Sequence, residues 1–169
     1  MSTAVVTRRA DAHDLQAISA LHAHVFGPGR FARSAYRVRE GTGAMSRFCR
    51  VADLNGRLVA AVRITQTTIG GVAGAALLGP VAVDPQFKGL GHGRKLVAEA
   101  LDDMKAAGVR LVVLVGDETY YGRFGFKPVA PGTITFPGPV NPQRILAAEL
   151  ADGMLANYRG VIAAAVEVV

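Results

Sequence analysis

Three β-type runs joined by tight turns lie between residues 48 and 83, and they constrain the fold more than any other feature of the sequence. Residues 48–54 and 58–66 flank Asn55-Gly56, the dipeptide most typical of a two-residue hairpin turn. A second turn at Gly70-Gly71 leads into residues 75–83. These runs predict a three-stranded antiparallel meander.

A helix and an apolar strand follow the meander. Residues 93–107 show a helical pattern in which apolar residues gather on one side and charged residues mostly on the other. Gly108 closes this helix, and residues 111–115 (LVVLV) have the composition of a fully buried strand. A strand, a helix and an apolar strand in series predict a crossover between parallel neighbours.

The flanking segments are predicted from weaker patterns. Asp11 offers an N-cap for a helix with an apolar face up to Val25, and residues 30–40 predict a second helix closed by Gly41. On that second helix Arg30, Arg33 and Arg37 would share one face. A short helix is expected near residues 120–124, and edge or closing strands around 134–136 and 144–150.

Composition narrows the class of protein. A length of 169 residues suits one domain spanning residues 1–169, and 50% hydrophobic with 19% charged residues excludes a disordered chain. The net charge of +6 favours anionic partners. The sequence gives little support to a surface on which nucleic-acid bases stack, because it has no Trp. The apolar stretch of residues 64–83 is interrupted by Gln66, Pro80 and glycines, so no membrane span is expected.

Cysteine and histidine usage argues against a metal centre. Cys49 is the single cysteine, which excludes an internal disulfide and a Cys-rich zinc site and fits a reducing cytoplasm. His22 and His24 are two residues apart and do not share a helix face. The sequence therefore predicts no metal.

The most informative segment is residues 78–94, LGPVAVDPQFKGLGHGR. Gly89, Gly91 and Gly93 alternate between a strand end and a helix start, where free backbone N–H groups and the helix dipole favour phosphate. Lys88 and Arg94 add positive charge. These features predict a phosphate-binding loop, whereas a tight strand-to-helix turn without a ligand is the plain alternative.

Two other phosphate-binding motifs fail at this place. A dinucleotide-type G-x-G-x-x-G needs Gly at position 94 or 96, where the chain has Arg94 and Leu96, and the preceding strands are antiparallel hairpins. A Walker A loop fails because no Gly-Lys-Ser/Thr follows.

The segment resembles the GCN5-related N-acetyltransferase (GNAT) superfamily, whose signature is Gln or Arg, two residues, Gly, one residue, then Gly or Ala. Lys88-Gly89-Leu90-Gly91-His92-Gly93 matches it except at the first position, where Lys88 lacks the planar donor array of Arg. The resemblance continues through residues 112–117 and through the run YYGRFGF of residues 120–126. The match, specific over residues 76–127, looks most like the YhbS-type branch of predicted acetyltransferases.

The resemblance implies an α/β fold with a mixed, mostly antiparallel sheet that splays between its fourth and fifth strands and is flanked by helices. It also implies that the pantetheine arm of acetyl-CoA enters the splay while the pyrophosphate rests on the glycine loop. The implied cofactor-binding residues are Val81, Ala82, Val83, Lys88, Gly89, Leu90, Gly91, His92, Gly93 and Arg94. Dimers are common in the superfamily, so a homodimer is one possible assembly of this chain.

The implied reaction is direct attack of a primary amine on the thioester, without an acyl-enzyme. Tyr121 matches the position of the general acid that protonates the leaving thiolate, and Tyr120 is the competing neighbour. Asp117 and Glu118 are candidates to help remove the amine proton, and Arg30, Arg33 and Arg37 for holding an anionic acceptor. The alternatives are a non-catalytic acyl-CoA-binding module and a basic RNA-binding protein.

Overall fold

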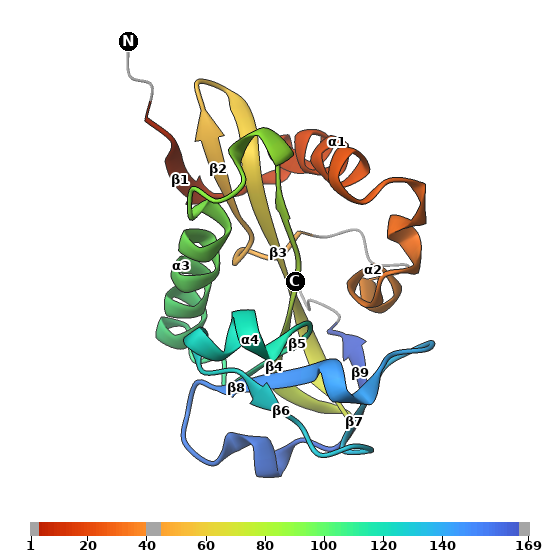
Figure 1. Ribbon diagram of the computed structural model, residues 1–169. Coiled ribbons are helices and arrows are strands. Elements are labelled where there is room, and N and C mark those ends of the chain that lie inside the picture. Colours follow the sequence, from red (N-terminus) through yellow and green to blue (C-terminus); the bar gives the residue numbers. More distant parts are fainter. Residues whose placement is uncertain (1–3, 40–44, 166–169) are drawn as a thin grey trace.

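A mixed β-sheet forms the centre of the computed structural model, which describes residues 4–39 and 45–165 (Figure 1). Its strands within those residues are β1 (Val6–Arg9), β2 (Arg50–Leu54), β3 (Arg57–Ile69), β4 (Val72–Val83), β5 (Leu111–Val115), β6 (Lys127–Pro128), β7 (Ile134–Thr135), β8 (Ile145–Glu149) and β9 (Gly160–Ala164). The hydrogen-bonded order is β1-β2-β3-β4-β5-β8-β6, and β9 pairs with β3 and β7.

The helices cover both faces of this sheet. They are α1 (Leu15–Phe26), α2 (Ser34–Arg39), α3 (His92–Ala106) and α4 (Glu118–Tyr121). Short 3-10 helices are η1 (Ala12–Asp14), η2 (Pro28–Ala32), η3 (Pro85–Phe87), η4 (Gly122–Phe124), η5 (Pro142–Arg144) and η6 (Met154–Asn157). Figure 1 shows α3 on one side of the sheet and α1 and α2 on the other.

The predicted meander and crossover are confirmed. β2, β3 and β4 pair antiparallel in sequence, and Asn55 and Gly56 turn the first hairpin with φ values of 52° and 89°. Positive φ at both positions is what a tight two-residue hairpin requires. After α3, β5 returns parallel to β4, so the strand–helix–strand unit has the expected arrangement.

β4 and β5 separate partway along their length. Their parallel pairing runs from Ala75 opposite Leu111 to Leu77 opposite Val113 and goes no further, although β4 continues to Val83. In the pairing of β4 with β3, Ile64 lies opposite Leu78 and Val62 lies opposite Val81. Two residue steps on β3 therefore span three on β4, and the extra residue forms a β-bulge at Gly79-Pro80. A bulge bends its strand and increases the local twist, so β4 turns away from β5 at this point. The predicted splay between the fourth and fifth strands is confirmed.

Alternating residues of the central strands build the apolar layers. Ala52 and Val62 face α3 and join a cluster with its Leu96, Val97, Ala100 and Met104. Val51, Ala61 and Ala82 face the other way and pack with Ile18 and Leu21 of α1. Because successive strand residues point to opposite faces, one set of strands supports both helix layers.

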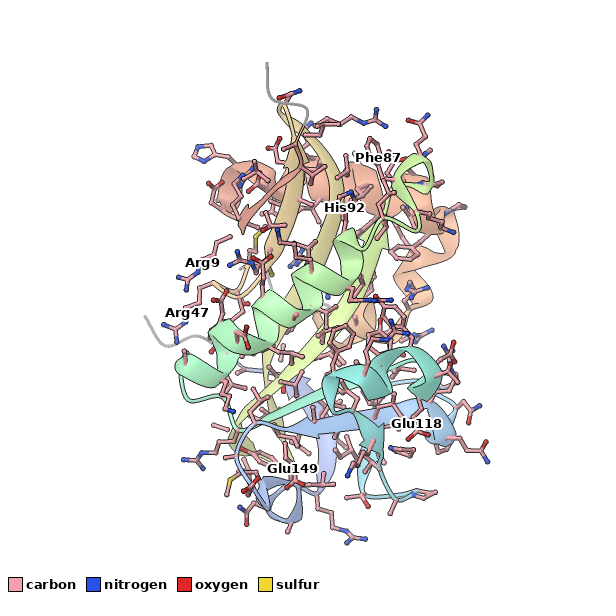
Figure 2. All side chains as sticks on the ribbon, turned by 60° about the vertical axis from the view of Figure 1, so that its left-hand side comes forward. Arg9, Arg47, Phe87, His92, Glu118 and Glu149 are labelled. Atoms are coloured by element: carbon pink, nitrogen blue, oxygen red, sulfur yellow. The ribbon has the colours of Figure 1, made fainter. Side chains whose placement is uncertain are left out.

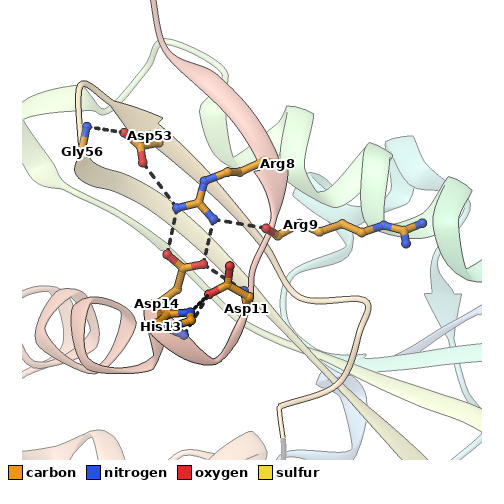
Figure 3. Close-up of polar contacts among 7 residues, drawn as sticks. All are labelled: Arg8, Arg9, Asp11, His13, Asp14, Asp53 and Gly56. Atoms are coloured by element: carbon orange, nitrogen blue, oxygen red, sulfur yellow. Dashed lines mark hydrogen bonds and ion pairs between the residues drawn. The ribbon is translucent and has the colours of Figure 1, made fainter.

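An ionic cluster joins β1, the start of α1 and β2. Both terminal nitrogens of Arg8 donate to the Asp14 carboxylate at 2.8 Å, and Nη2 also lies 3.4 Å from Asp53 (Figure 3). The same Asp14 carboxylate accepts from the backbone N–H of Asp11 and completes the capping box with it. The Arg8 guanidinium, mainly through this hydrogen bonding, holds the pKa of Asp14 below its usual range.

Two expectations about the flanks are corrected, and one strand was not expected. The predicted helix over residues 30–40 is η2 and α2, separated at Arg33, whose ψ of 145° is extended; Glu40 and Gly41 lie outside the described residues. The edge or closing strand expected around residues 144–150 is present as β8, but it is not an edge, because it pairs with β5 on one side and β6 on the other. The strand β9 was not predicted, because its sequence GVIAA becomes a strand only by pairing with β3 and β7.

Candidate functional site

A groove of about 600 Å³ opens where β4 and β5 separate. Most of its residues come from the two separated strands and the turn after β5, from the glycine loop with the start of α3, and from α4; α1, the junction of η2 with α2, and η5 contribute one residue each. They are Val25, Arg33, Val81, Val83, Lys88, Gly89, Gly93, Val115, Gly116, Asp117, Tyr120, Tyr121 and Arg144. Beyond Leu77, the edge of β4 toward β5 has no strand partner among the described residues, so its backbone groups are available to a ligand.

The glycines of the loop have two different reasons to be glycine. Gly89 and Gly91 have φ values of +78° and +84°, a left-handed conformation that other residues adopt only with strain. Gly93 lies inside α3, where a Cβ would come within 3.1 Å of Cγ2 of Val83 and 3.4 Å of Cγ1 of Val81. Its missing side chain lets the start of α3 approach β4 closely.

The first turn of α3 presents its N–H groups without a protein cap. The N-cap residue is Gly91, no side chain caps the helix within the described chain, and the first turn holds no acidic residue. Unpaired N–H groups at the start of a 15-residue helix, with Lys88 beside them, form a favourable site for phosphate.

The predicted cofactor-binding residues fall into two groups. The side chains or backbone of Val81, Val83, Lys88, Gly89 and Gly93 line the groove together with the predicted acid. Ala82, Leu90, Gly91, His92 and Arg94 do not line it.

The second group faces elsewhere. Ala82 packs under α1, and Arg94 is exposed. Leu90, Gly91 and His92 line a separate cavity of about 440 Å³ together with Phe87. Figure 2 shows His92 beside Phe87 at the start of α3, where their ring centroids are 6.4 Å apart. A side-chain role toward the groove is therefore not supported for His92.

Tyr121 lies deep in the groove among aromatic rings. Its ring contacts those of Tyr120, Phe124 and Phe126, and its hydroxyl has no hydrogen-bond partner among the residues described. Burial, followed by the neighbouring Tyr120, raises the pKa of Tyr121 to about 12. The hydroxyl therefore keeps its proton throughout the neutral pH range.

Gly116 makes room for that ring, a role that sequence reasoning missed. A Cβ at Gly116 would come within 2.6 Å of Cε2 of Tyr121, so any other residue would displace the ring. Tyr120 lies on the α3 side, where its hydroxyl is 3.8 Å from the position of a Cβ on Gly93. The two tyrosines therefore reach different parts of the groove.

Arg144 is a second residue that sequence reasoning missed. β8 brings it beside the end of β5, where its carbonyl accepts from the N–H of Gly116 and its Nε lies 3.4 Å from Asp117. Asp117 lines the groove, whereas Glu118, the exposed first residue of α4, does not. No local pattern marks Arg144, because its position depends on strand pairing across 30 residues of chain.

The three arginines expected on one helix face are separated. Arg33 lines the groove, and its guanidinium carbon lies 4.2 Å from the centre of the Phe26 ring. Arg30 donates to the carbonyl of Gly27, and Arg37 lies against Gly138. The extended conformation at Arg33 causes this separation. The prediction that the three arginines share one helix face is therefore wrong, and of the three only Arg33 lines the groove.

The described residues contain neither a candidate metal site nor a membrane-spanning helix. Across residues 4–39 and 45–165, no three His, Cys, Asp or Glu side chains are grouped so that they could hold a metal ion. In the same part of the chain, no helix is both long and apolar enough to cross a membrane.

The splayed sheet, the uncapped α3 and the groove between them define an acyltransferase of the GNAT class. Residues 6–129 match the family model described as "Acetyltransferase (GNAT) domain", and the chain belongs to this family. The prediction from the signature and the YYGRFGF run is therefore confirmed at the level of family and fold. That residues 1–169 form one domain stays a prediction.

Relatives from several bacteria are similar over much of the chain. The uncharacterized N-acetyltransferase YjhQ of Escherichia coli is 28% identical over 137 residues, 79% of this chain and 74% of YjhQ. The crystal structure of Escherichia coli YhbS with CoA superposes with a TM-score of 0.82 at 26% identity and covers 98% of this chain and 92% of YhbS. A Brucella melitensis GNAT acetyltransferase with acetyl-CoA has a TM-score of 0.66 and 30% identity, over 86% and 96% of the chains.

Proposed function

We propose that this protein transfers an acetyl group from acetyl-CoA to a primary amine by direct attack in a ternary complex. The observation that carries the proposal is the groove itself, in which an unpaired strand edge, an uncapped helix start and a half-buried tyrosine converge. The CoA and acetyl-CoA bound to the YhbS and Brucella melitensis structures support it. A cytoplasmic location, expected from the single Cys49 thiol, belongs to the same proposal.

The acyl donor would lie along β4. The amides of its pantetheine arm would pair with the open backbone edge near Val81, Ala82 and Val83, as an added strand does. Its pyrophosphate would accept hydrogen bonds from the N–H groups between Gly89 and Arg94, with Lys88 adding charge. Leu90, Gly91, His92 and Gly93 would then contribute through their backbone.

The chemistry needs one proton removed and one supplied. The amine nitrogen attacks the thioester carbon, the carbon–sulfur bond breaks, and the nitrogen loses a proton while the sulfur gains one. Tyr121 would supply the proton to sulfur, because its raised pKa keeps the hydroxyl protonated and its ring is held by three aromatic neighbours. Burial that raises the pKa of the tyrosine also raises the proton affinity of a thiolate beside it.

The test separates an enzyme from a binding module. Calorimetry measures the affinity for acetyl-CoA. Turnover is measured as release of the CoA thiol in the presence of each of a panel of primary amines, and mass spectrometry identifies the N-acetyl product. We expect saturable binding and amine-dependent thiol release. Binding with no thiol release across the panel would favour the non-catalytic module, and salt-sensitive RNA binding that survives a change at Gly91 would favour the RNA-binding alternative.

A further inference from the structure

A second cavity, of about 260 Å³, adjoins the groove on the side away from the glycine loop. The residues that line this cavity and not the groove are Ser34 and Ala35 of α2 and residues 77–80 of β4. Arg33, Val81, Val115, Tyr121 and Arg144 line both spaces. The cavity therefore meets the groove at Tyr121, so a molecule bound in it would lie beside the proposed acid.

The charged side chains of this cavity have one sign. Arg33 and Arg144 line it, and no carboxylate is among the described residues that do. Arg33 is exposed, is held against the Phe26 ring, and pairs with no carboxylate in the described chain. Both guanidinium groups act on the Tyr121 hydroxyl, lowering its pKa against the effect of burial. The positive charge is therefore concentrated next to the proposed acid.

Asp117 compensates part of that charge. Its carboxylate lies 3.4 Å from Nε of Arg144 and lines the groove but not the small cavity. Asp117 thus offsets one of the two arginines that line the cavity and leaves Arg33 without a carboxylate partner in the described chain, an arrangement that suits a singly charged carboxylate better than a dianionic phosphate. A volume of about 260 Å³ is below the usual range of ligand pockets, roughly 300–1,000 Å³, and therefore suits a small molecule.

We infer that the acceptor is a small primary amine that carries a carboxylate group, and that Arg33 and Arg144 bind this carboxylate in the 260 Å³ cavity. The inference rests on the proposed acetyl transfer, since it identifies the acceptor of that reaction. A planar guanidinium presents paired donors to a carboxylate, and such charge-assisted bonds are stronger than neutral ones. With the carboxylate at these arginines, the amine end of the acceptor would point along Tyr121 toward the groove.

The experiment compares acceptors that differ in one end group. The probes are 3-aminopropionate, its neutral amide 3-aminopropionamide, and 2-aminoethyl phosphate, with rates expressed per concentration of unprotonated amine. We expect kcat/KM for 3-aminopropionate to exceed that for the amide by about 10-fold or more, the size typical of a charge-assisted hydrogen bond. Equal values for acid and amide would overturn the inference while leaving acetyl transfer intact. A higher value for the phosphate would overturn the choice of carboxylate.

Variants locate the effect. Arg33→Gln and Arg144→Gln should each raise KM for 3-aminopropionate by about 10-fold and change KM for the amide little. Arg47→Gln is the matched control, because Arg47 is exposed, stacks on Phe48 and lines neither space. Retention of the acid-over-amide preference in both site variants would contradict the assignment.

A binding measurement keeps the inference testable if no probe amine is acetylated. In that outcome the proposed function fails, and calorimetry of 3-aminopropionate with the CoA-bound protein decides the cavity chemistry on its own. Saturable binding that is weakened in Arg33→Gln and unchanged in Arg47→Gln would support the carboxylate site. Absence of binding to the CoA-bound wild type would overturn it.

Discussion

The rings of Tyr120 and Tyr121 meet edge to face, with centroids 4.8 Å apart and planes at 86°. Adjacent in sequence, they therefore present their hydroxyls in different directions, one toward the start of α3 and the other into the junction of the two cavities. This geometry allows a substitution at either position to be interpreted separately.

Tyr121→Phe should lower kcat by about 10²-fold while acetyl-CoA affinity holds within a few-fold, because the ring packing stays and only the proton donor is lost. Tyr120→Phe is the matched control and should leave kcat nearly unchanged. Single-turnover acetylation of an active amine checks this. An exchange of the two phenotypes would make Tyr120 the acid, and full rates in both would remove the acid from the mechanism.

Gly91→Ala and Gly108→Ala should cost similar stability but differ in function. Both glycines have a left-handed backbone, with φ values of +84° and +87°, and a Cβ on either would meet open space. Each alanine variant should therefore lose about 1–2 kcal/mol of unfolding free energy through backbone strain alone, as measured by urea unfolding. Only Gly91 lies at the start of α3, so only its variant should weaken acetyl-CoA binding in calorimetry. Equal affinities in the two variants would contradict a phosphate site at this loop.

His22 should make stability depend on pH between about 4 and 6.5. Burial, with the Arg39 and Arg63 charges, lowers the pKa of His22 to about 4, and its Nδ1 is hydrogen-bonded to the Tyr36 hydroxyl. The unfolded chain then binds the proton first, so the contribution is complete above pH 6.5 and is lost as pH falls toward 4. His22→Gln should flatten the unfolding free energy across this window.

The control for that measurement is His13→Gln, because the side chain of His13 is 97% exposed. It should retain the wild-type slope. Identical slopes for wild type and His22→Gln would show that the buried imidazole contributes nothing to the pH dependence.

Asp14→Asn should reduce the unfolding free energy by about 1–2 kcal/mol, because it removes the carboxylate to which both terminal nitrogens of Arg8 donate. The loss stays this small because Arg8 is partly exposed and water screens the ion pair. The lowered pKa of Asp14 means that this contribution is present above pH 3.8 and lost as pH falls below it. Urea unfolding at pH 7 measures the loss. Asp152→Asn, at an exposed position, is the control, and an equal effect there would contradict a specific role of the Arg8 pair.

Local sequence patterns predicted the parts of the fold that depend on nearby residues. The Asn55-Gly56 turn, the meander and the glycine loop before α3 are each encoded within a few positions, and the family signature lies in the same stretch. The break at Arg33 has no Gly or Pro to mark it, since Pro28 and Gly29 lie several residues earlier. Strand β9 is likewise unmarked, because only its pairing with β3 and β7 makes GVIAA a strand.

The candidate site divides in the same way. Sequence motifs predicted Lys88, Gly89 and Tyr121 as site residues, and all three line the groove. Arg144 was not, because strand pairing brings it to the end of β5 from a distant part of the chain. The role of Gly116 depends on the Tyr121 ring that its missing side chain admits, which becomes visible only in three dimensions.

The bulge at Gly79-Pro80 also affects how readily the open edge of β4 can pair with a strand of another chain. An unpaired edge such as that of β4 beyond Leu77 is a template for intermolecular pairing and aggregation. Pro80 has no N–H to offer an incoming strand, and the bulge interrupts the regular spacing that a continuous ladder requires. The irregularity that separates β4 from β5 thus also disfavours regular pairing of this edge with an incoming strand.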